Sequence, residues 1–339
     1  MRELAQELLA GQEAWVVGGA DRDALLGREL VDLDIACAEP EQAARAYAAR
    51  SGGAPFPLSE RHGAWRVALD RGRTVDFTPL HGSIEADLFT RDFTINAIAE
   101  PLAGGEPLDP SGGREDLELR VIRAVTEEAF EADPLRLLRA VRLEDELGFR
   151  MAPLTEELVR RHAELVTRPA GERTLSELVR LSAAGYRRLA DVGLLQRLGG
   201  AVDERLDRLD SPDYRLVAAF GANVETFPIS NEQRRYARKL LRARPPENGS
   251  ARAIHRFRRK TEPWALDALA FVGAQEHVKA VELSREDDPD EPLLRGDELG
   301  LEPGPEIGRL LALVEEERAA GTIRTREEAL ALVRRELQP

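Results

Sequence analysis

The sequence predicts an α+β protein in which a mixed head of about 120 residues precedes a long all-α region. Short β-prone runs bounded by turn signals are confined to the first third of the chain. After about residue 120, apolar residues recur at helical spacing almost to the C-terminus. The composition agrees, because Leu, Ala, Arg and Glu dominate and all four are good helix formers.

Within the head, the elements alternate between strand and helix. A helix is expected at residues 3–10 and another at 39–50. The expected strands are at residues 15–17, 33–36, 64–69 and 74–78. The last two strands are joined by the turn-prone residues 70–73.

The remaining chain is expected to be a series of helices. In the segment 134–147, Leu135, Leu138, Val141 and Leu143 lie near helical spacing. Further helices are expected at 154–165, 175–184 and 186–198. Connections rich in Gly, Pro, Asp or Asn are expected at 199–200, 210–213, 244–250 and 285–292.

The composition argues against a disulfide-bonded, secreted or membrane-spanning protein. The single cysteine, Cys37, cannot form an internal disulfide, which fits a reducing cytosol. Neither a signal peptide nor an apolar run of about 18 residues is recognisable, so we expect a cytoplasmic protein without a membrane partner. The net charge of −14 argues against a nucleic-acid binder, but local charge matters more because screening acts within about 8–10 Å.

The candidate metal site is the motif Asp32-Leu33-Asp34 in a β-prone run. Alternate residues of a strand share a face, so the two carboxylates should project together, roughly 6–7 Å apart. That separation suits one or two Mg²⁺ ions, which prefer carboxylate oxygens and keep positions open for phosphates. The motif alone is weak, because Asp288-Pro289-Asp290 repeats it in an acidic loop where solvated charge is expected.

The residues before this motif suggest a phosphate site. Gly18-Gly19 ends the preceding strand, and Arg22 follows at the start of a helix-like stretch. Glycines let backbone amides approach a phosphate, and Arg22 adds a fixed positive charge. The alternatives are an ordinary tight turn and a surface ion pair between Arg22 and Asp23.

In combination, five ordered motifs resemble class II tRNA nucleotidyltransferases and bacterial poly(A) polymerases. The motifs are GGADRDALLG with VDLDIA, DLFTRDFTINAIA, DPLRLLRAVRL, GERTLSEL and LLRGDELGLEPGPEIGRLL, and they extend from about residue 15 to 335. The resemblance implies a polymerase-β-like nucleotidyltransferase head at 1–122, a helical neck with a nucleotide-reading helix at 123–200, and a helical body and tail at 201–339 that binds tRNA.

The resemblance also implies a role for each matching position. Asp32 and Asp34 would bind Mg²⁺ and carry catalysis. The positions expected to contact the nucleotide are Gly18, Gly19, Arg22, Arg91, Asp92, Asn96, Asp133, Arg136 and Arg139.

Asp133 and Arg136 are the pair with which the family reads the nucleobase. They are three residues apart and so share a helix face. Asp offers acceptors and Arg offers a planar fork of donors, so protein rather than a template could select C or A. The alternative is a surface salt bridge worth about 0.2–0.5 kcal/mol.

Three departures from the family pattern affect these expectations. The second motif usually has two arginines before its Asp, whereas this chain has Thr90. The segment 79–87 is shorter than in many relatives, and in some members a shortened loop accompanies loss of the final A addition. The third catalytic carboxylate is open between Asp76 and Asp92.

A basic stretch provides the expected RNA contact. Residues 233–260 contain eleven Arg or Lys and one acid, Glu247. Such a surface favours recognition of RNA shape and backbone, as for the acceptor arm of tRNA. The side chains singled out are Arg234, Arg235, Arg238, Lys239 and Arg242. A solvated basic helix is the alternative.

The sequence thus predicts template-independent addition of CMP and AMP, from CTP and ATP, to the 3′ end of tRNA. Within the same class, the alternatives are a poly(A) polymerase and an enzyme that adds CC alone or A alone. Outside it, the alternatives are a non-catalytic RNA-binding protein and a nucleotidyltransferase acting on a small substrate. The sequence leaves the oligomeric state open.

Overall fold

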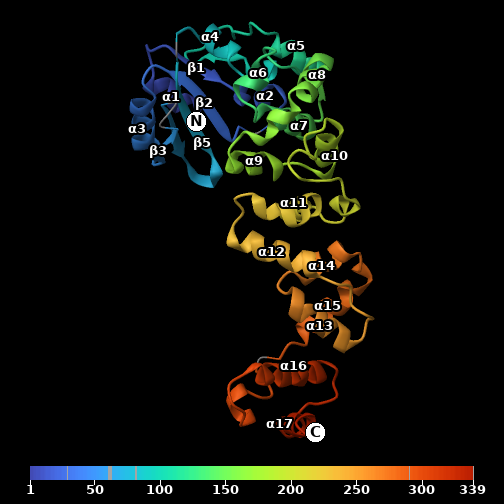
Figure 1. The fold of residues 1–339 in the computed structure, drawn as a ribbon. Coiled ribbons are helices and arrows are strands. Elements are labelled where there is room, and N and C mark those ends of the chain that lie inside the picture. The colour runs from blue at the N-terminus through green and yellow to red at the C-terminus, as the bar shows by residue number, and fades with distance from the viewer. Residues whose placement is uncertain (29, 60–62, 81, 290, 339) are drawn as a thin grey trace. The chain divides into compact units, whose positions relative to one another are not determined.

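The computed structural model describes residues 1–339 apart from 29, 60–62, 81, 290 and 339 (Figure 1). Contacts divide the chain into two compact units, Met1–Leu198 and Gly199–Pro339. The first contains all the sheet structure and the second is helical, so the predicted α+β class is confirmed. The predicted division of the first unit near residue 122 stays a prediction.

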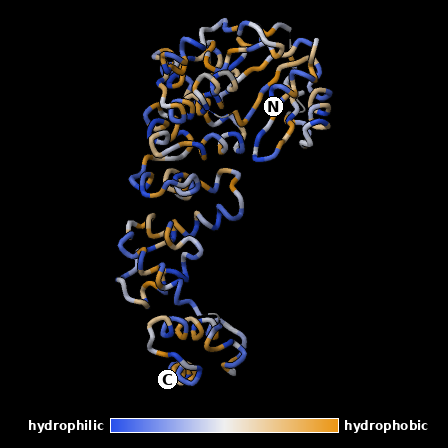
Figure 2. The backbone as a smooth tube through the Cα atoms, turned by 180° about the vertical axis from the view of Figure 1, so that it is seen from behind, coloured by the Kyte–Doolittle hydropathy of each residue, from blue (hydrophilic) through white to orange (hydrophobic). Residues whose placement is uncertain are grey.

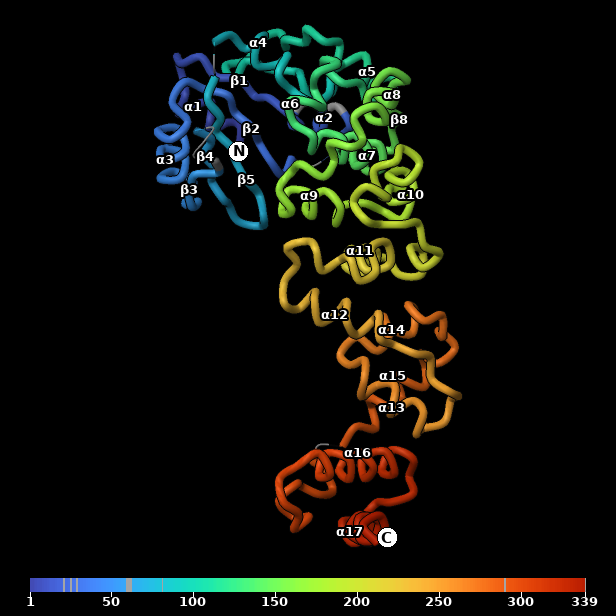
Figure 3. The backbone as a smooth tube through the Cα atoms, viewed as in Figure 1, coloured from blue at the N-terminus to red at the C-terminus, as the bar shows by residue number. Residues whose placement is uncertain are grey.

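The first unit is built on a sheet of six strands. These are β1 (Ala14–Val17), β2 (Asp32–Cys37), β3 (Ala54–Ser59), β4 (Ala64–Ala68), β5 (Thr74–Pro79) and β6 (Ala99–Pro101). Their order across the sheet is β3-β4-β5-β2-β1-β6, and the chain can be followed through it in Figure 3. Strands β2 and β5 run parallel, whereas the other neighbours are antiparallel.

One face of this sheet carries the core of the head. Leu33, Ile35, Val75 and Phe77 are buried there with Tyr47 of α3 (Pro40–Ser51). Because side chains alternate along a strand, the intervening positions of β2 and β5 face the opposite side. The functional carboxylates therefore lie on the face away from this core.

Two strands of this sheet were not expected from the sequence. Strand β6 has three residues, and β3 contains Pro55 and Pro57. Proline cannot donate to a ladder, so its presence argues against a central strand. The two prolines are tolerated because β3 lies at the edge of the sheet, where no neighbouring strand needs the N–H groups that proline lacks. The predicted turn at 70–73 contains a short 3₁₀ segment, Asp70–Gly72.

Helices complete the first unit. They are α1 (Arg2–Leu8), α2 (Gly19–Leu25), α4 (Ile84–Phe89), α5 (Gly113–Leu119), α6 (Ala129–Ala132), α7 (Arg136–Leu147), α8 (Pro153–Arg161), α9 (Gly171–Leu178) and α10 (Ala183–Asp191). Two short strands, β7 (Val121–Ile122) and β8 (Arg150–Met151), pair in parallel between them.

The predicted helices at 175–184 and 186–198 were misplaced. The chain instead breaks between α9 and α10, where Ser182 caps α10 by accepting from the amides of Ala184 and Gly185. Asp145 of α7 holds this break by accepting from the Ser182 amide at 2.7 Å. Helix α10 then ends near Gly193, whose φ is +79°. Side-chain capping from a distant helix thus decided a boundary that local periodicity did not reveal.

The second unit is helical throughout its described residues. Its helices are α11 (Pro212–Phe220), α12 (Asn231–Arg242), α13 (Ala251–Thr261), α14 (Ala265–Val272), α15 (Val278–Glu286), α16 (Pro305–Ala319) and α17 (Arg326–Glu336). Figure 2 shows hydrophilic and hydrophobic residues interspersed along the chain; α12 and α13 are strongly amphipathic, whereas α14 is apolar along most of its length. None of the helices described here is long and apolar enough to cross a membrane.

Candidate active site

The site is built around the central strand β2. Asp34 lies opposite Val17 of β1 on one side and opposite Asp76 of β5 on the other. Asp32 lies opposite Thr74, whose hydroxyl donates to its Oδ1 at 2.7 Å. Asp32 and Asp34 line the same cavity, so the strand does bring the two predicted carboxylates together.

Asp76, and not Asp92, is the carboxylate next to this pair. Asp76 is in register with Asp34 and is 7% exposed. Arg66 of β4 holds it with two hydrogen bonds of 2.7 Å, from Nε and Nη2. Burial, followed by the negative charge of Asp76, raises the pKa of Asp34 to about 6. Three carboxylates therefore crowd one face of the sheet.

Asp92 is engaged elsewhere in the site. It accepts hydrogen bonds from the Phe93 amide at 2.8 Å, from Asn96 at 3.0 Å and from Arg139 Nε at 2.8 Å. Burial alone would raise its pKa, but Arg139 and these hydrogen bonds lower it below the usual value. Asp92 thus holds Arg139 and Asn96 in place.

Gly18 shapes the edge of the site next to Asp34. It precedes α2 with φ 80° and ψ −134°, a conformation essentially restricted to glycine. A Cβ at this position would lie 2.6 Å from Asp34 Oδ2. The absence of a side chain therefore permits the approach of the β1–α2 turn to the carboxylate.

Arg22 projects from α2 into the same region. Its Nη1 donates to Asn96 Oδ1 at 2.7 Å, and its Nη2 lies 2.9 Å from Asp23. The ion pair with Asp23, considered above as an alternative, does form. It leaves Arg22 on the cavity wall, because both residues line it together with Asn96.

These residues enclose a cavity of about 600 Å³. Its predicted lining residues are Gly18, Gly19, Arg22, Asp32, Asp34, Arg91, Asp92, Asn96 and Arg139. The residues that were not predicted are Ala20, Asp23, Arg28, Val31, Arg142, Glu146 and Arg180. The lining combines the carboxylates of Asp32 and Asp34 with six arginines, and guanidinium groups suit the phosphates of a nucleotide.

The unpredicted residues of the neck form a network of charges. Arg142 of α7 is buried and pairs with Glu177 of α9 and with Glu146. Arg180 pairs with Glu146 at 3.1 Å. Arg142 follows Arg136 and Arg139 at intervals of three residues on α7, and this helical spacing was the signal for it in the sequence.

Asp133 and Arg136 lie outside the lining of this cavity, and among the described residues their side chains form no hydrogen bond or ion pair with each other. Asp133 pairs with Arg173 of α9 at 2.7 Å. Arg136 donates from Nη2 to the Thr90 carbonyl at 2.6 Å and from Nη1 to the Arg91 carbonyl at 3.3 Å. The alternative of a surface salt bridge between the two is therefore wrong.

The basic stretch is split between α12 and α13 and is partly neutralised. Glu225 accepts two hydrogen bonds from Arg238, at 2.7 and 2.8 Å, and lies 3.9 Å from Arg234. Arg235 and Arg242 are exposed and have no ion pair among the described residues. Lys239 donates to the Lys260 carbonyl at 2.9 Å.

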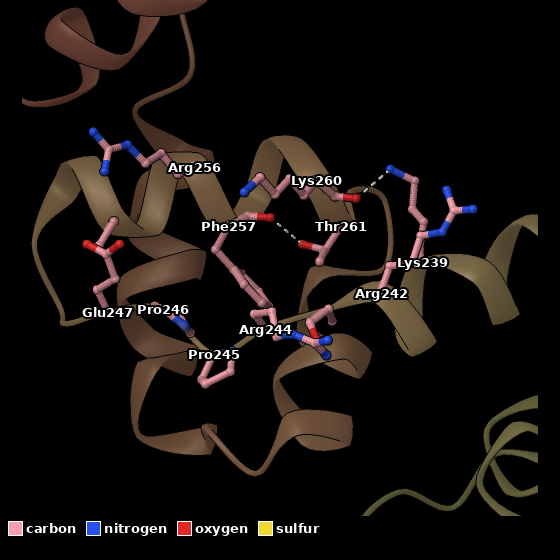
Figure 4. A pocket seen from close by; sticks show the side chains of 12 residues that line it. Lys239, Arg242, Arg244, Pro245, Pro246, Glu247, Arg256, Phe257, Lys260 and Thr261 are labelled. Carbon is pink, nitrogen blue, oxygen red and sulfur yellow. Dashed lines mark hydrogen bonds between the residues drawn. The ribbon is translucent and has the colours of Figure 1, made fainter. Parts of the chain in front are cut away.

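Lys239 and Arg242 also line a second cavity, of about 470 Å³, between α12 and α13 (Figure 4). Its other polar and aromatic lining includes Arg244, Arg256, Lys260, Phe257 and Glu247. Arg256 is paired with Glu316 at 2.6 Å, so its charge is partly neutralised.

The second Asp-x-Asp motif is not a free acidic pair. Asp288 is ion-paired with Arg258, with Oδ1 2.9 Å from Nη1, and Asp290 lies outside the described residues. His62 and His81 also lie outside them.

Comparison with known proteins identifies relatives along most of the chain. Residues 14–123 match the poly(A) polymerase head domain. The chain is 33% identical to the CC-adding tRNA nucleotidyltransferase of Thermus thermophilus, over 95% of this chain and 93% of that protein. It is also 33% identical to the A-adding tRNA nucleotidyltransferase of Deinococcus radiodurans, over 95% of each.

A third relative matches over a shorter region. The CC-adding tRNA nucleotidyltransferase of Geobacter sulfurreducens is 44% identical over 230 residues, which are 63% of this chain and 53% of that protein. The chain thus spans about half the length of this relative.

Solved structures share the fold. The CCA-adding enzyme of Bacillus stearothermophilus in complex with CTP superposes with a TM-score of 0.78 at 26% identity, over 99% of this chain and 96% of that one. A CCA-adding enzyme in complex with ATP gives a TM-score of 0.79 at 22% identity, over 99% and 95%.

Proposed function

Because the chain belongs to the family of tRNA nucleotidyltransferases and bacterial poly(A) polymerases, we propose that it adds CMP and AMP from CTP and ATP to the 3′ end of tRNA. The observation that carries this proposal is the cavity in which Asp32 and Asp34 face a wall of arginines. Relatives that match along nearly the whole chain are tRNA nucleotidyltransferases, which favours tRNA over a small substrate. This substrate also fits the cytoplasmic location expected from the sequence.

The carboxylates fit Mg²⁺. Asp32, Asp34 and Asp76 place oxygen donors on one face, and burial, followed by the negative charge of Asp76, raises the pKa of Asp34. Asp32 and Asp34 would hold the metal, with Asp76 as the third carboxylate. A bound metal would stabilise negative charge on the oxygens of an in-line phosphoryl displacement.

The arginines of the cavity hold the nucleotide's phosphates. Arg22 is oriented by Asn96, and Arg139 by Asp92, so both guanidinium groups are fixed before the substrate arrives. Arg91, paired with Asp87 at 2.8 Å, lines the same wall. This preorganised charge would stabilise the pyrophosphate as it leaves.

Asp133 and Arg136 would read the base. Arg173 fixes the carboxylate of Asp133, and main-chain carbonyls fix the guanidinium of Arg136. One group then presents acceptors and the other donors to the pairing edge of the nucleobase.

A second candidate is an enzyme that stops after CC. Four residues, 80–83, connect β5 to α4 in this chain, where many relatives carry a longer loop. Two of the relatives described above are CC-adding tRNA nucleotidyltransferases. Loss of A addition would leave the same carboxylates and the same chemistry in place.

The test is extension of a tRNA transcript that lacks its 3′ CCA end, with CTP alone, ATP alone or both, in the presence of Mg²⁺. Addition of CCA supports the first candidate, and arrest after CC supports the second. Asp32→Ala should abolish incorporation while circular dichroism stays unchanged. Asp288→Ala, in the second Asp-x-Asp motif, is the matched control and should keep full activity.

Other outcomes would overturn the proposal. A ladder of many A residues would indicate a poly(A) polymerase. Binding of tRNA without Mg²⁺-dependent incorporation would indicate a non-catalytic RNA-binding protein. Lack of any RNA binding would favour a small substrate.

A further inference from the structure

Phe56 stands at the end of a row of side chains that includes the catalytic carboxylates. The register places Phe56 opposite Arg66, Arg66 opposite Asp76, and Asp76 opposite Asp34. Directly paired residues project from the same face of a sheet. The bidentate contact between Arg66 and Asp76 confirms the face for the middle of the row.

Phe56 is unusually exposed for a large aromatic side chain. It is 41% exposed, and Leu58 on the same strand is 44% exposed, whereas the opposite face of the sheet is closed by the core under α3. Exposed apolar groups next to a functional site indicate an interaction surface. The register places Phe56 on the same side as the carboxylates.

This edge of the sheet is poorly suited to receive another strand. Pro55 and Pro57 alternate with Phe56, and proline in a sheet is confined to positions whose N–H would point away from the partner strand. The free edge of β3 therefore lacks donors at two of its six residues, a device that blocks strand addition. A ligand that stacks on the face suits Phe56 better than one that pairs with the edge.

The geometry of phosphoryl transfer identifies that ligand. The phosphate wall, with Gly18, Gly19 and Arg22, lies on the β1 side of Asp34. In an in-line displacement, the attacking and leaving oxygens lie on opposite sides of the transferred phosphorus. The 3′ end of the RNA must then approach from the β5 side, where the row continues through Asp76 and Arg66 to Phe56.

We propose that Phe56 is a stacking platform for a base near the 3′ end of the RNA strand that is extended. Phe56 lies three strand intervals from Asp34, about 14 Å at the usual strand spacing. That distance places the platform beyond the terminal ribose, whose 3′-hydroxyl reacts at the carboxylates. Aromatic platforms bind single-stranded RNA without reading its sequence, which suits tRNAs with different bases before the added nucleotides. The inference rests on the proposed function.

The kinetic test separates binding of RNA from binding of nucleotide. Loss of one base stack should raise the KM for a tRNA transcript about tenfold in Phe56→Ala. The KM for CTP and the kcat should stay within about twofold of wild type, because the contact is equal in ground and transition states. Phe56→Trp should restore the KM for RNA, and Leu119→Ala, which removes an apolar side chain exposed on α5, should change nothing.

A second readout does not depend on activity. RNA carrying 4-thiouridine in its last two nucleotides should photocrosslink to the peptide containing β3 in wild type and in Phe56→Trp, and not in Phe56→Ala. An unchanged KM for RNA in an active Phe56→Ala enzyme would overturn the proposal. So would a wild-type dimer that Phe56→Ala converts to a monomer, because a second copy would then cover the platform. If wild type incorporates nothing but the crosslink to β3 forms, the proposed function fails while the platform stands.

Discussion

Gly18→Ala should disable the enzyme by displacing a single carboxylate. The new Cβ would lie 2.6 Å from Asp34 Oδ2, whereas ordinary van der Waals contact begins at 3.4 Å. The oxygen or the turn must therefore move by about 0.8 Å. Because a misplacement of about 1 Å can cost on the order of 100-fold in rate, we expect the kcat for CMP incorporation to fall by about that factor.

The same substitution also strains the backbone. A residue with a side chain at φ 80° and ψ −134° costs on the order of 1–3 kcal/mol, so the free energy of unfolding should fall by that amount. Gly11→Ala is the matched control, because Gly11 has φ 78° but nothing within 4 Å of its Cβ position. It should lose a similar amount of stability and keep its activity.

The assay is steady-state CMP incorporation into a tRNA transcript, beside urea unfolding of both variants. The reasoning is refuted if Gly18→Ala keeps more than half of the wild-type kcat. It is also refuted if Gly11→Ala loses as much activity as Gly18→Ala, because backbone strain alone would then explain the loss.

Three further predictions follow from charged side chains. The raised pKa of Asp34 means that the folded chain binds this proton more tightly than the unfolded one, so metal-free stability should fall as pH rises from 3.8 to about 6. Asp34→Asn should therefore abolish incorporation yet raise the metal-free free energy of unfolding at pH 7 by on the order of 2 kcal/mol. An unchanged value would contradict the destabilisation of this carboxylate by burial and by the charge of Asp76. Arg173→Ala frees the carboxylate of Asp133 and should lower the preference for CTP over UTP about tenfold, measured by competition between the two nucleotides. An equal loss of incorporation rate with all nucleotides would refute a role of Asp133 in base reading. Arg242→Ala should weaken tRNA binding and reduce the slope of log K against log salt by about one. Arg238→Ala should weaken binding less, because Arg238 is already paired with Glu225. Equal losses of tRNA affinity in the two variants would show that the pair between Arg238 and Glu225 is broken when tRNA binds.

The carboxylates of the head show which site features can be predicted from the pattern of a single strand. Alternation along one strand predicted that Asp32 and Asp34 share a face, because that property depends on the strand alone. It could not decide between Asp76 and Asp92, since the choice depends on which strand lies beside β2 and in which register. The structure places Asp76 opposite Asp34 and commits Asp92 to Arg139.

For the arginines of the neck and body, the sequence likewise predicted the residues but not their contacts. The sequence located the arginines but did not identify the partners that lie far away in the chain, because such pairs depend on how the helices pack. Glu225 neutralises Arg238 from outside the basic stretch, and Arg173 engages Asp133 across 40 residues. Which cations remain available for RNA is therefore a property of the packed helices.

What the sequence alone determined is the chemistry: two carboxylates on one strand, a Gly-Gly turn before them and arginines on a helix behind them. These features are short-range, and each can be predicted from spacing along a single element. The tertiary structure decided which carboxylate lies beside Asp34, the partners of the arginines and the exposed position of Phe56. Phe56 became visible only through pairing, because its strand contains two prolines and adopts its place at the sheet edge by contact with β4 rather than by local propensity.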